Sequence, residues 1–247
     1  MAPKGTAGAS HPLVAVYADE SCLGNGKAGH TPGGAGGLVE WRHPKTGETL
    51  RWDWWVSEPD TTNNRMALRS VIETFDGLSH KGRTFSVVFT SDSKYVVDGM
   101  TAWVPGWMRR GWTRKTGPIE NLELWQQAVA SAARHERMWR WVRGHNGHPQ
   151  NEYANFLATR AAAEQTTSGG LVPSGFDAWA AAERAKGKRR GSLDPFPAAE
   201  AFTAAPAYPG AGVKAPATPS AKTPGVTAGA ANGAGRVAGA PAGASPA

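Results

Sequence analysis

Only one cysteine, Cys22, occurs in the 247-residue chain, so neither an intramolecular disulfide nor a cysteine-based zinc site can form. Such scarcity is typical of proteins from a reducing compartment. No run of about 18 apolar residues is present, and the stretch after Lys4 lacks the apolar character of a signal peptide. We therefore expect a cytoplasmic protein that does not associate with membranes.

Charge and composition are unevenly distributed along the chain. Lys and Arg number 27 against 20 Asp and Glu, which gives a net charge of +7 and a pI of about 9.8. This basic excess favours a polyanionic partner, either nucleic acid or an anionic membrane surface. Most of the 11 tryptophans lie between Trp41 and Trp141, whereas glycine and proline concentrate toward the C-terminus. The two regions therefore need separate interpretations.

Hydrophobic periodicity predicts one α/β domain with a mixed five-stranded sheet flanked by helices. Short β-branched or alternating runs predict strands, and apolar residues at i, i+3, i+4 and i+7 predict helices. The expected strands are 13–18, 38–41, 49–56, 85–90 and 138–142. The expected helices lie between 64 and 76 and over 94–100, 120–135 and 152–164. This order of strands and helices is typical of a single α/β domain.

The remaining segments are expected to lie outside that domain. Residues 1–12 are interpreted as a flexible N-terminus, 13–165 as the domain, and 166–197 as a short basic linker with one weakly amphipathic helix. Residues 198–247 are mainly Ala, Pro and Gly and bury too little apolar area to offset their chain entropy. We expect that tail to be disordered.

Two acids follow the ends of predicted strands. Asp19 comes directly after strand 13–18, and Asp92 comes shortly after strand 85–90. Because neighbouring strand ends converge on one crevice in an α/β sheet, the pair is a candidate metal site. The alternative is that each acid caps a turn or a helix.

Six short motifs in a fixed order favour the metal site. They are DESCLGN (19–25), TNNRM (62–66), TSDSKYV (90–96), GW (111–112), NLELW (121–125), and WVRGH with GHP and NE (141–152). Together they resemble a type 1 ribonuclease H over residues 14–164. The resemblance implies a ribonuclease H-like fold and a nuclease that cuts the RNA strand of an RNA–DNA hybrid with two Mg²⁺ ions held by four acids. Whether Mn²⁺ replaces Mg²⁺ is left open.

The resemblance also implies roles for individual residues of the centre. Asp19 matches the first acid, Asp92 the third, and His145 the loop histidine that helps to activate water or release product. The second acid, usually Glu, is Ala67 here, and the fourth, usually Asp, is Asn155, which keeps a weak carbonyl ligand. Two carboxylates supply a charge of −2 against the +4 of two Mg²⁺ ions, so we expect the second metal to be weakly bound or absent.

Glu20 is the candidate compensating acid, because the family usually has glycine at that position. Strand alternation argues against it, since adjacent residues point to opposite faces unless a bulge intervenes. Two functions therefore remain open from the sequence. The chain is either a hybrid-cutting endoribonuclease with a weakened or rearranged site, or a non-catalytic protein that binds RNA–DNA hybrids or duplex RNA.

The matched nucleic-acid-binding positions are more complete than the acids. Cationic side chains supply salt-dependent phosphate contacts, and aromatic rings pack against sugars. The positions that match the family's basic protrusion are Trp103, Trp107, Arg109, Arg110 and Trp112. The positions that match its minor-groove contacts are Cys22, Asn25, Asn63 and Asn64. Alternatively, the tryptophans belong to the core and Asn63 caps its helix. We expect a monomer that binds an RNA–DNA hybrid.

Overall fold

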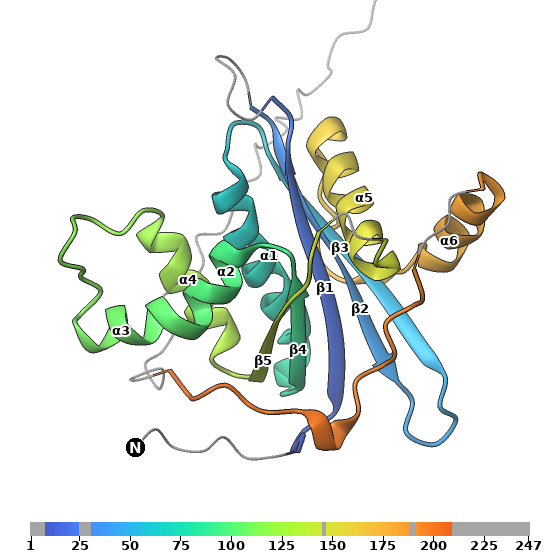
Figure 1. Cartoon of the computed structure of the whole chain (residues 1–247), viewed down its shortest axis with the longest axis horizontal. Coiled ribbons are helices and arrows are strands. Elements are labelled where there is room, and N and C mark those ends of the chain that lie inside the picture. Colours follow the sequence, from blue (N-terminus) through green and yellow to red (C-terminus); the bar gives the residue numbers. More distant parts are fainter. Residues whose placement is uncertain (1–7, 25–30, 145–146, 188–190, 209–247) are drawn as a thin grey trace, which may run out of the picture. The chain divides into compact units, whose positions relative to one another are not determined.

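The computed structural model describes residues 8–24, 31–144, 147–187 and 191–208 (Figure 1). Its strands form a mixed sheet in the order β5-β4-β1-β2-β3-β6, in which β1, β4 and β5 are parallel and the other neighbours are antiparallel. The strand bounds are β1 Leu13–Cys22, β2 Gly33–Arg42, β3 Thr49–Glu58, β4 Ser86–Ser91, β5 Glu136–Trp141 and β6 Val172–Pro173. The α/β fold with a mixed sheet is confirmed, but the sheet has six strands rather than five.

Six α-helices flank the sheet in the described part of the chain. Their bounds are α1 Asn63–Leu78, α2 Lys94–Asp98, α3 Val104–Arg109, α4 Leu122–Ala132, α5 Pro149–Glu164 and α6 Phe176–Ala185. A π-helical turn, Gly99–Trp103, joins α2 to α3, and short 3-10 turns lie at His80–Gly82 and Ala199–Ala201. No helix among these residues is long and apolar enough to cross a membrane.

Alternating residues of β1 build two separate cores. Val14, Val16 and Ala18 pack with residues of α1 and α4 on one face of the sheet. Ala15 and Tyr17 pack with residues of α5 and α6 on the other face. This alternation is the period-2 pattern of a strand that is buried on both sides. It places α1 and α5 on opposite faces of the same strand.

Glycines in β2 allow α5 to lie directly on the sheet. A Cβ atom at Gly36 would lie 2.6 Å from Leu157 Cβ and 2.7 Å from the Ala158 nitrogen, both in α5. A Cβ atom at Gly34 would collide with the Ala158 carbonyl. Because Gly34 and Gly36 have no side chain, α5 can lie in direct contact with β2. This close packing also places the first turn of α5 beside β1.

The domain continues beyond the predicted boundary at residue 165. Strand β6 pairs with β3, and Asp53 of β3 anchors the start of α6 by accepting hydrogen bonds from Ser174 Oγ at 2.6 Å and Gly175 N at 2.9 Å. Phe176 then buries its ring completely in the α5-side core. The segment expected to be a linker thus contributes both a strand and core residues.

Residues 191–208, here called the C-terminal strap, also pack on the domain. Phe202 and Tyr208 are buried, and the Ala205 nitrogen donates to the Arg137 carbonyl of β5. The prediction of a disordered tail from residue 198 is therefore wrong for residues 198–208, because single aromatic anchors in an Ala/Pro/Gly-rich background are enough to dock it. Residues 209–247 lie outside the described residues.

The strap also binds the N-terminal segment that the sequence predicts to be flexible. Gly8 N donates to the Phe202 carbonyl at 3.0 Å, and Ala9 N donates to the Ala199 carbonyl at 2.9 Å. Residues 8 to 12 are therefore held in place, and the two ends of the described chain lie side by side.

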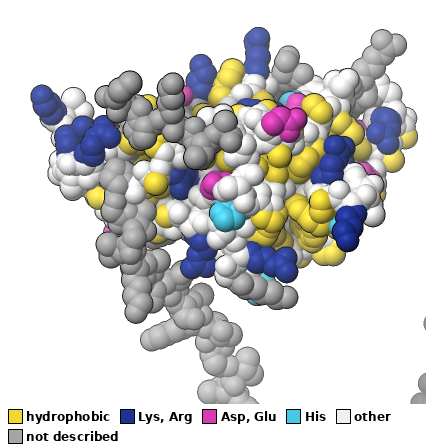
Figure 2. All heavy atoms as spheres, turned by 90° about the horizontal axis from the view of Figure 1, so that it is seen from below, with side chains coloured by type: hydrophobic (Ala, Val, Ile, Leu, Met, Phe, Trp, Pro, Cys, Tyr) yellow, Lys and Arg dark blue, Asp and Glu magenta, His cyan; other side chains and the backbone are white. Residues whose placement is uncertain are grey.

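The view from below shows Lys and Arg side chains spread among hydrophobic ones, with few Asp or Glu (Figure 2).

Candidate active site

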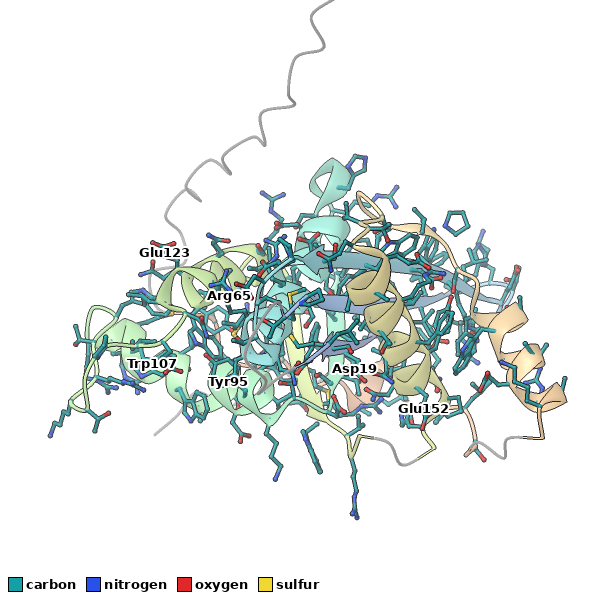
Figure 3. All side chains as sticks on the ribbon, turned by 90° about the horizontal axis from the view of Figure 1, so that it is seen from above. Asp19, Arg65, Tyr95, Trp107, Glu123 and Glu152 are labelled. Carbon is teal, nitrogen blue, oxygen red and sulfur yellow. The ribbon has the colours of Figure 1, made fainter. Side chains whose placement is uncertain are left out.

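Three acids meet where the parallel strands β1 and β4 end. Asp19 and Glu20 lie near the end of β1, and Asp92 follows β4 by one residue. Each of the three offers a carboxylate oxygen, and these oxygens all lie within 4.8 Å of one another. In Figure 3, Asp19 lies between α5 and the helices that contain Tyr95 and Trp107. The structure thus brings together both strand-end acids and the candidate compensating acid.

Neighbouring strand residues reach the same point without a bulge. Asp19 pairs with Gly36 and Glu20 with Ala35 in uninterrupted register, so Asp19 points to the α5 face and Glu20 to the α1 face. The pairing of β1 with β4 ends at Ala18, so β4 no longer covers this edge of β1 beyond that residue. Both side chains therefore reach around the edge toward Asp92. Alternation is present, but it does not separate the two carboxylates.

Burial and mutual repulsion favour the protonated forms of Asp19 and Glu20. Burial, with added repulsion from Asp92 and Glu20, raises the pKa of Asp19 to about 9. Burial and the charge of Asp92 raise the pKa of Glu20 to about 8. Oxygen Oε2 of Glu20 is buried and has no hydrogen-bond partner among the described residues. Clustered hard oxygen donors, one of them unpaired, fit a divalent cation such as Mg²⁺.

Two amide groups hold Asp19 in a single orientation. The Glu20 backbone nitrogen donates to Asp19 Oδ1 at 2.7 Å, and Asn151 Nδ2 of α5 donates to Asp19 Oδ2 at 3.2 Å. Asn151 is only 2% exposed, so water does not compete for this contact. The sequence interpretation missed Asn151, although it lies one helical turn before Asn155 and therefore on the same face of α5.

The positions of the two altered acids differ in what they offer. Ala67 of α1 is fully buried in the α1-side core and supplies no ligand. Asn155 is half-buried on α5, one turn after Asn151, and retains a neutral carbonyl oxygen. The structure thus leaves Glu20 as the acid on the α1 face of the centre.

A glycine after β5 closes the site next to Asp92. A Cβ atom at Gly144 would collide with Asp92 Oδ2, so a side chain at this position would have to displace the carboxylate. Trp141 Nε1 donates to the Asp92 carbonyl at 3.0 Å and ties the end of β5 to the same residue. His145, the expected catalytic histidine, and Asn25, an expected contact, lie outside the described residues.

The expected minor-groove contacts lie at the start of α1 and the end of β1. Thr62, not Asn63, caps α1, because its side chain accepts from the Arg65 nitrogen. Asn63 is half-buried, and its Oδ1 has no partner among the described residues, while Asn64 is exposed. Burial raises the pKa of Cys22 to about 11, so its thiol is protonated at neutral pH. Of the two asparagines, only Asn64 is exposed at this surface.

The basic protrusion is built around a cluster of aromatic rings. Trp103 is 39% exposed, and its ring packs against those of Tyr95, Trp107 and Trp125. Trp107 is only 8% exposed, so it supports the protrusion more than it offers a contact surface. Exposed cations and a half-buried ring complete the predicted set, namely Arg109, Arg110 and Trp112. A cavity of about 550 Å³ lies among these side chains.

Comparison with known proteins identifies the family to which this fold belongs. The sequence model of the RNase H family matches residues 11–163, and the chain belongs to this family. It is 45% identical to ribonuclease H of Bordetella avium over 153 residues, which are 61% of this chain and 91% of the relative. It is 43% identical to ribonuclease H of Stutzerimonas stutzeri over 148 residues, or 60% and 89% of the two chains. The resemblance to ribonuclease H is thus confirmed.

A solved structure extends the likeness beyond the family match. The crystal structure of LC9-RNase H1 is 60% identical with a TM-score of 0.77, and the match covers 83% of this chain and 98% of that one. That protein is described as a type 1 RNase H with the type 2 active-site motif. Since residues 11–163 alone span less than 83% of the chain, this match includes part of the segment after residue 163.

Proposed function

We propose that the chain is a divalent-metal-dependent endoribonuclease that cuts the RNA strand of RNA–DNA hybrids, with Glu20 in place of the acid absent at position 67. The observation that supports this most directly is the meeting of Asp19, Glu20 and Asp92 oxygens within 4.8 Å. The type 2 active-site motif described for LC9-RNase H1 adds support, because that protein is a type 1 RNase H whose active-site motif is not the type 1 motif.

Charge balance favours hydrolysis over mere binding. Asp19 and Asp92 alone supply a charge of −2, and Glu20 brings the total to −3. A bound phosphate adds about −1, so that the total negative charge approaches the +4 of two Mg²⁺ ions. Asp19, Glu20 and Asp92 would hold the metal, with Asn155 as a neutral oxygen donor. When bound, the metal supplies Lewis-acid chemistry and lowers the pKa of water. Mg²⁺ is the proposed cofactor, and Mn²⁺ is the alternative to be tested.

The chain's own residues provide orientation and substrate binding. Asn151 and the Glu20 amide fix the Asp19 carboxylate, and Gly144 lets the backbone approach Asp92. Arg109 and Arg110 are exposed. They would contact phosphates of the hybrid, which would make binding salt-dependent. We propose the hybrid as the main partner and retain duplex RNA as a competitor to be measured. The expected monomeric state and cytoplasmic location stay predictions.

A cleavage assay on the full chain tests the proposal. A hybrid with labelled RNA is incubated with wild type, Glu20→Gln and the exposed-acid control Glu123→Gln, in Mg²⁺ or Mn²⁺. We expect Glu20→Gln to lower cleavage by at least about 10²-fold, as losses of preorganised electrostatic groups do, and to leave hybrid affinity unchanged. The control should behave like wild type.

Three other outcomes separate the alternatives. Hybrid binding without cleavage in either metal would show that the chain is a non-catalytic binder. Cleavage that does not respond to Glu20→Gln would refute the role of this residue. Equal affinity for hybrid, duplex RNA and duplex DNA would refute recognition of the hybrid.

A further inference from the structure

Asp194 is the residue of the C-terminal strap that contacts the end of β5 and the start of α5. Its carboxylate forms an ion pair with the Arg140 guanidinium of β5, and its Oδ2 lies 3.3 Å from His148 Nε2. Its backbone is held in both directions, since Gln150 Nε2 donates to the Asp194 carbonyl at 3.0 Å and Asp194 N donates to Gln150 Oε1 at 3.1 Å. Gln150 is only 1% exposed, so its two hydrogen bonds to the Asp194 backbone are shielded from water. Asp194 thus joins the strap to the start of α5.

His148 connects Asp194 to the first turn of α5. It is the N-cap of this helix, and its Nδ1 accepts from the Asn151 backbone nitrogen at 3.3 Å. A neutral imidazole has one N–H, so a ring that accepts at Nδ1 has its hydrogen on Nε2. That nitrogen lies 3.3 Å from Asp194 Oδ2 without the geometry of a hydrogen bond. The negative charge of Asp194 at this distance favours a hydrogen on Nε2 and hence the tautomer that can cap α5.

Asn151 completes the connection to the acidic centre. Its backbone nitrogen binds His148, and its side chain donates to Asp19 Oδ2. A shift in the cap would move the first turn of α5 and hence the amide that orients Asp19. A continuous series of contacts, Asp194 to His148 to Asn151 to Asp19, thus joins the strap to the centre.

We propose that Asp194 is a positioning residue for the active site, which acts through His148 and Asn151. This inference rests on the proposed function for its catalytic consequence. Asp194 lies outside the residues matched by the family model, so the strap would complete a site that the family domain otherwise builds alone. Contacts beyond the metal ligands typically change metal affinity or activity by about 10–100-fold when removed.

The test compares Asp194→Asn with Phe202→Leu in the full chain. Both variants weaken the strap, but only the first alters the contact with His148. We expect Asp194→Asn to raise the Mn²⁺ dissociation constant and the half-saturating Mn²⁺ concentration for cleavage by about tenfold, and to lower kcat with little change in KM for the hybrid. Phe202→Leu should lower Tm at least as much without these effects.

A double-mutant cycle tests the route through His148. Asparagine is a good N-cap that needs no support from Asp194, so Asp194→Asn should have no further effect in a His148→Asn background. An undiminished effect in that background would overturn the proposed route. Equal metal dependence in Asp194→Asn and Phe202→Leu would overturn the positioning role.

Calorimetric titration with Mn²⁺ keeps the two proposals distinguishable. A wild type that binds Mn²⁺ without cutting hybrid would contradict the proposed function, while the effect of Asp194→Asn on Mn²⁺ affinity would still test the positioning role. A wild type that binds no Mn²⁺ would overturn both.

Discussion

Replacing Asp19 by asparagine should stabilise the metal-free protein at neutral pH, although Asp19 is buried and hydrogen-bonded. Burial and the neighbouring acids raise its pKa from 3.8 to about 9 in the folded state. An acid with a raised folded pKa contributes stability below its unfolded pKa, and this contribution is lost as the pH rises toward the folded value. The free energy of unfolding should therefore fall between about pH 4 and pH 9.

The size of the effect follows from the same pKa values. One unit of pKa difference corresponds to about 1.36 kcal/mol. At pH 7 Asp19 is ionised in the unfolded chain and protonated in the folded one, so the interval from 3.8 to 7 gives an upper limit of about 4 kcal/mol. Glu20 shares the repulsion, so the two shifts are not independent. We expect Asp19→Asn to raise the free energy of unfolding by about 2 kcal/mol at pH 7.

Urea unfolding followed by tryptophan fluorescence measures this directly. Wild type, Asp19→Asn and the control Glu123→Gln are compared in EDTA at pH 5, 7 and 9, where the advantage of Asp19→Asn should grow with pH. Saturating Mg²⁺ should stabilise wild type and reduce this advantage, because the cation offsets the carboxylate repulsion. An Asp19→Asn variant that is less stable than wild type in EDTA at pH 7 would refute the reasoning.

Gly144→Ala should abolish cleavage without unfolding the protein, because its methyl group displaces the Asp92 carboxylate; kcat and circular dichroism measure the two effects, and wild-type cleavage would contradict this. Ala67→Glu should lower the free energy of unfolding by about 3–5 kcal/mol, since it buries a further charge in the core, and Glu20→Gly should reduce that loss. Urea titration decides this, and an unchanged midpoint for Ala67→Glu would refute it. Burial lowers the pKa of His135 to about 4, so stability should be lost as the pH falls from about 6.5 to about 4. His135→Gln should flatten that dependence in Tm measurements, and parallel profiles would contradict it.

The sequence predicts the parts of the site that depend on strand ends. Asp19 and Asp92 follow buried apolar runs, and parallel strands end at the same edge, so the pattern allowed their meeting and the six motifs decided for it over separate caps. The position of the Glu20 carboxylate could not be predicted in this way. Strand alternation tells on which face of the sheet a side chain begins, but not whether the side chain bends around the edge of the strand. That depends on where pairing with β4 stops, which is a property of register.

The sequence interpretation was weakest after residue 165. Composition there is dominated by Ala, Pro and Gly, and an average over such a segment hides single anchors such as Phe202 and Tyr208. Asp194 was equally hidden, since its partners are brought together only by the folded sheet and α5. Trp107 shows the opposite difficulty, because the same aromatic residue type serves a binding surface and a core, and only burial distinguishes them.

The pairing of Gly8 and Ala9 with the strap has a consequence for the order of folding. These contacts join residues that lie 190 or more positions apart, so closing this loop is entropically costly until the sheet between them exists. During synthesis the residues of the family domain are also made before residues 191–208. We expect the strap to dock last, onto a domain that has already folded. A nascent chain would then acquire the final orientation of Asp19 only after residues 191–208 have been translated.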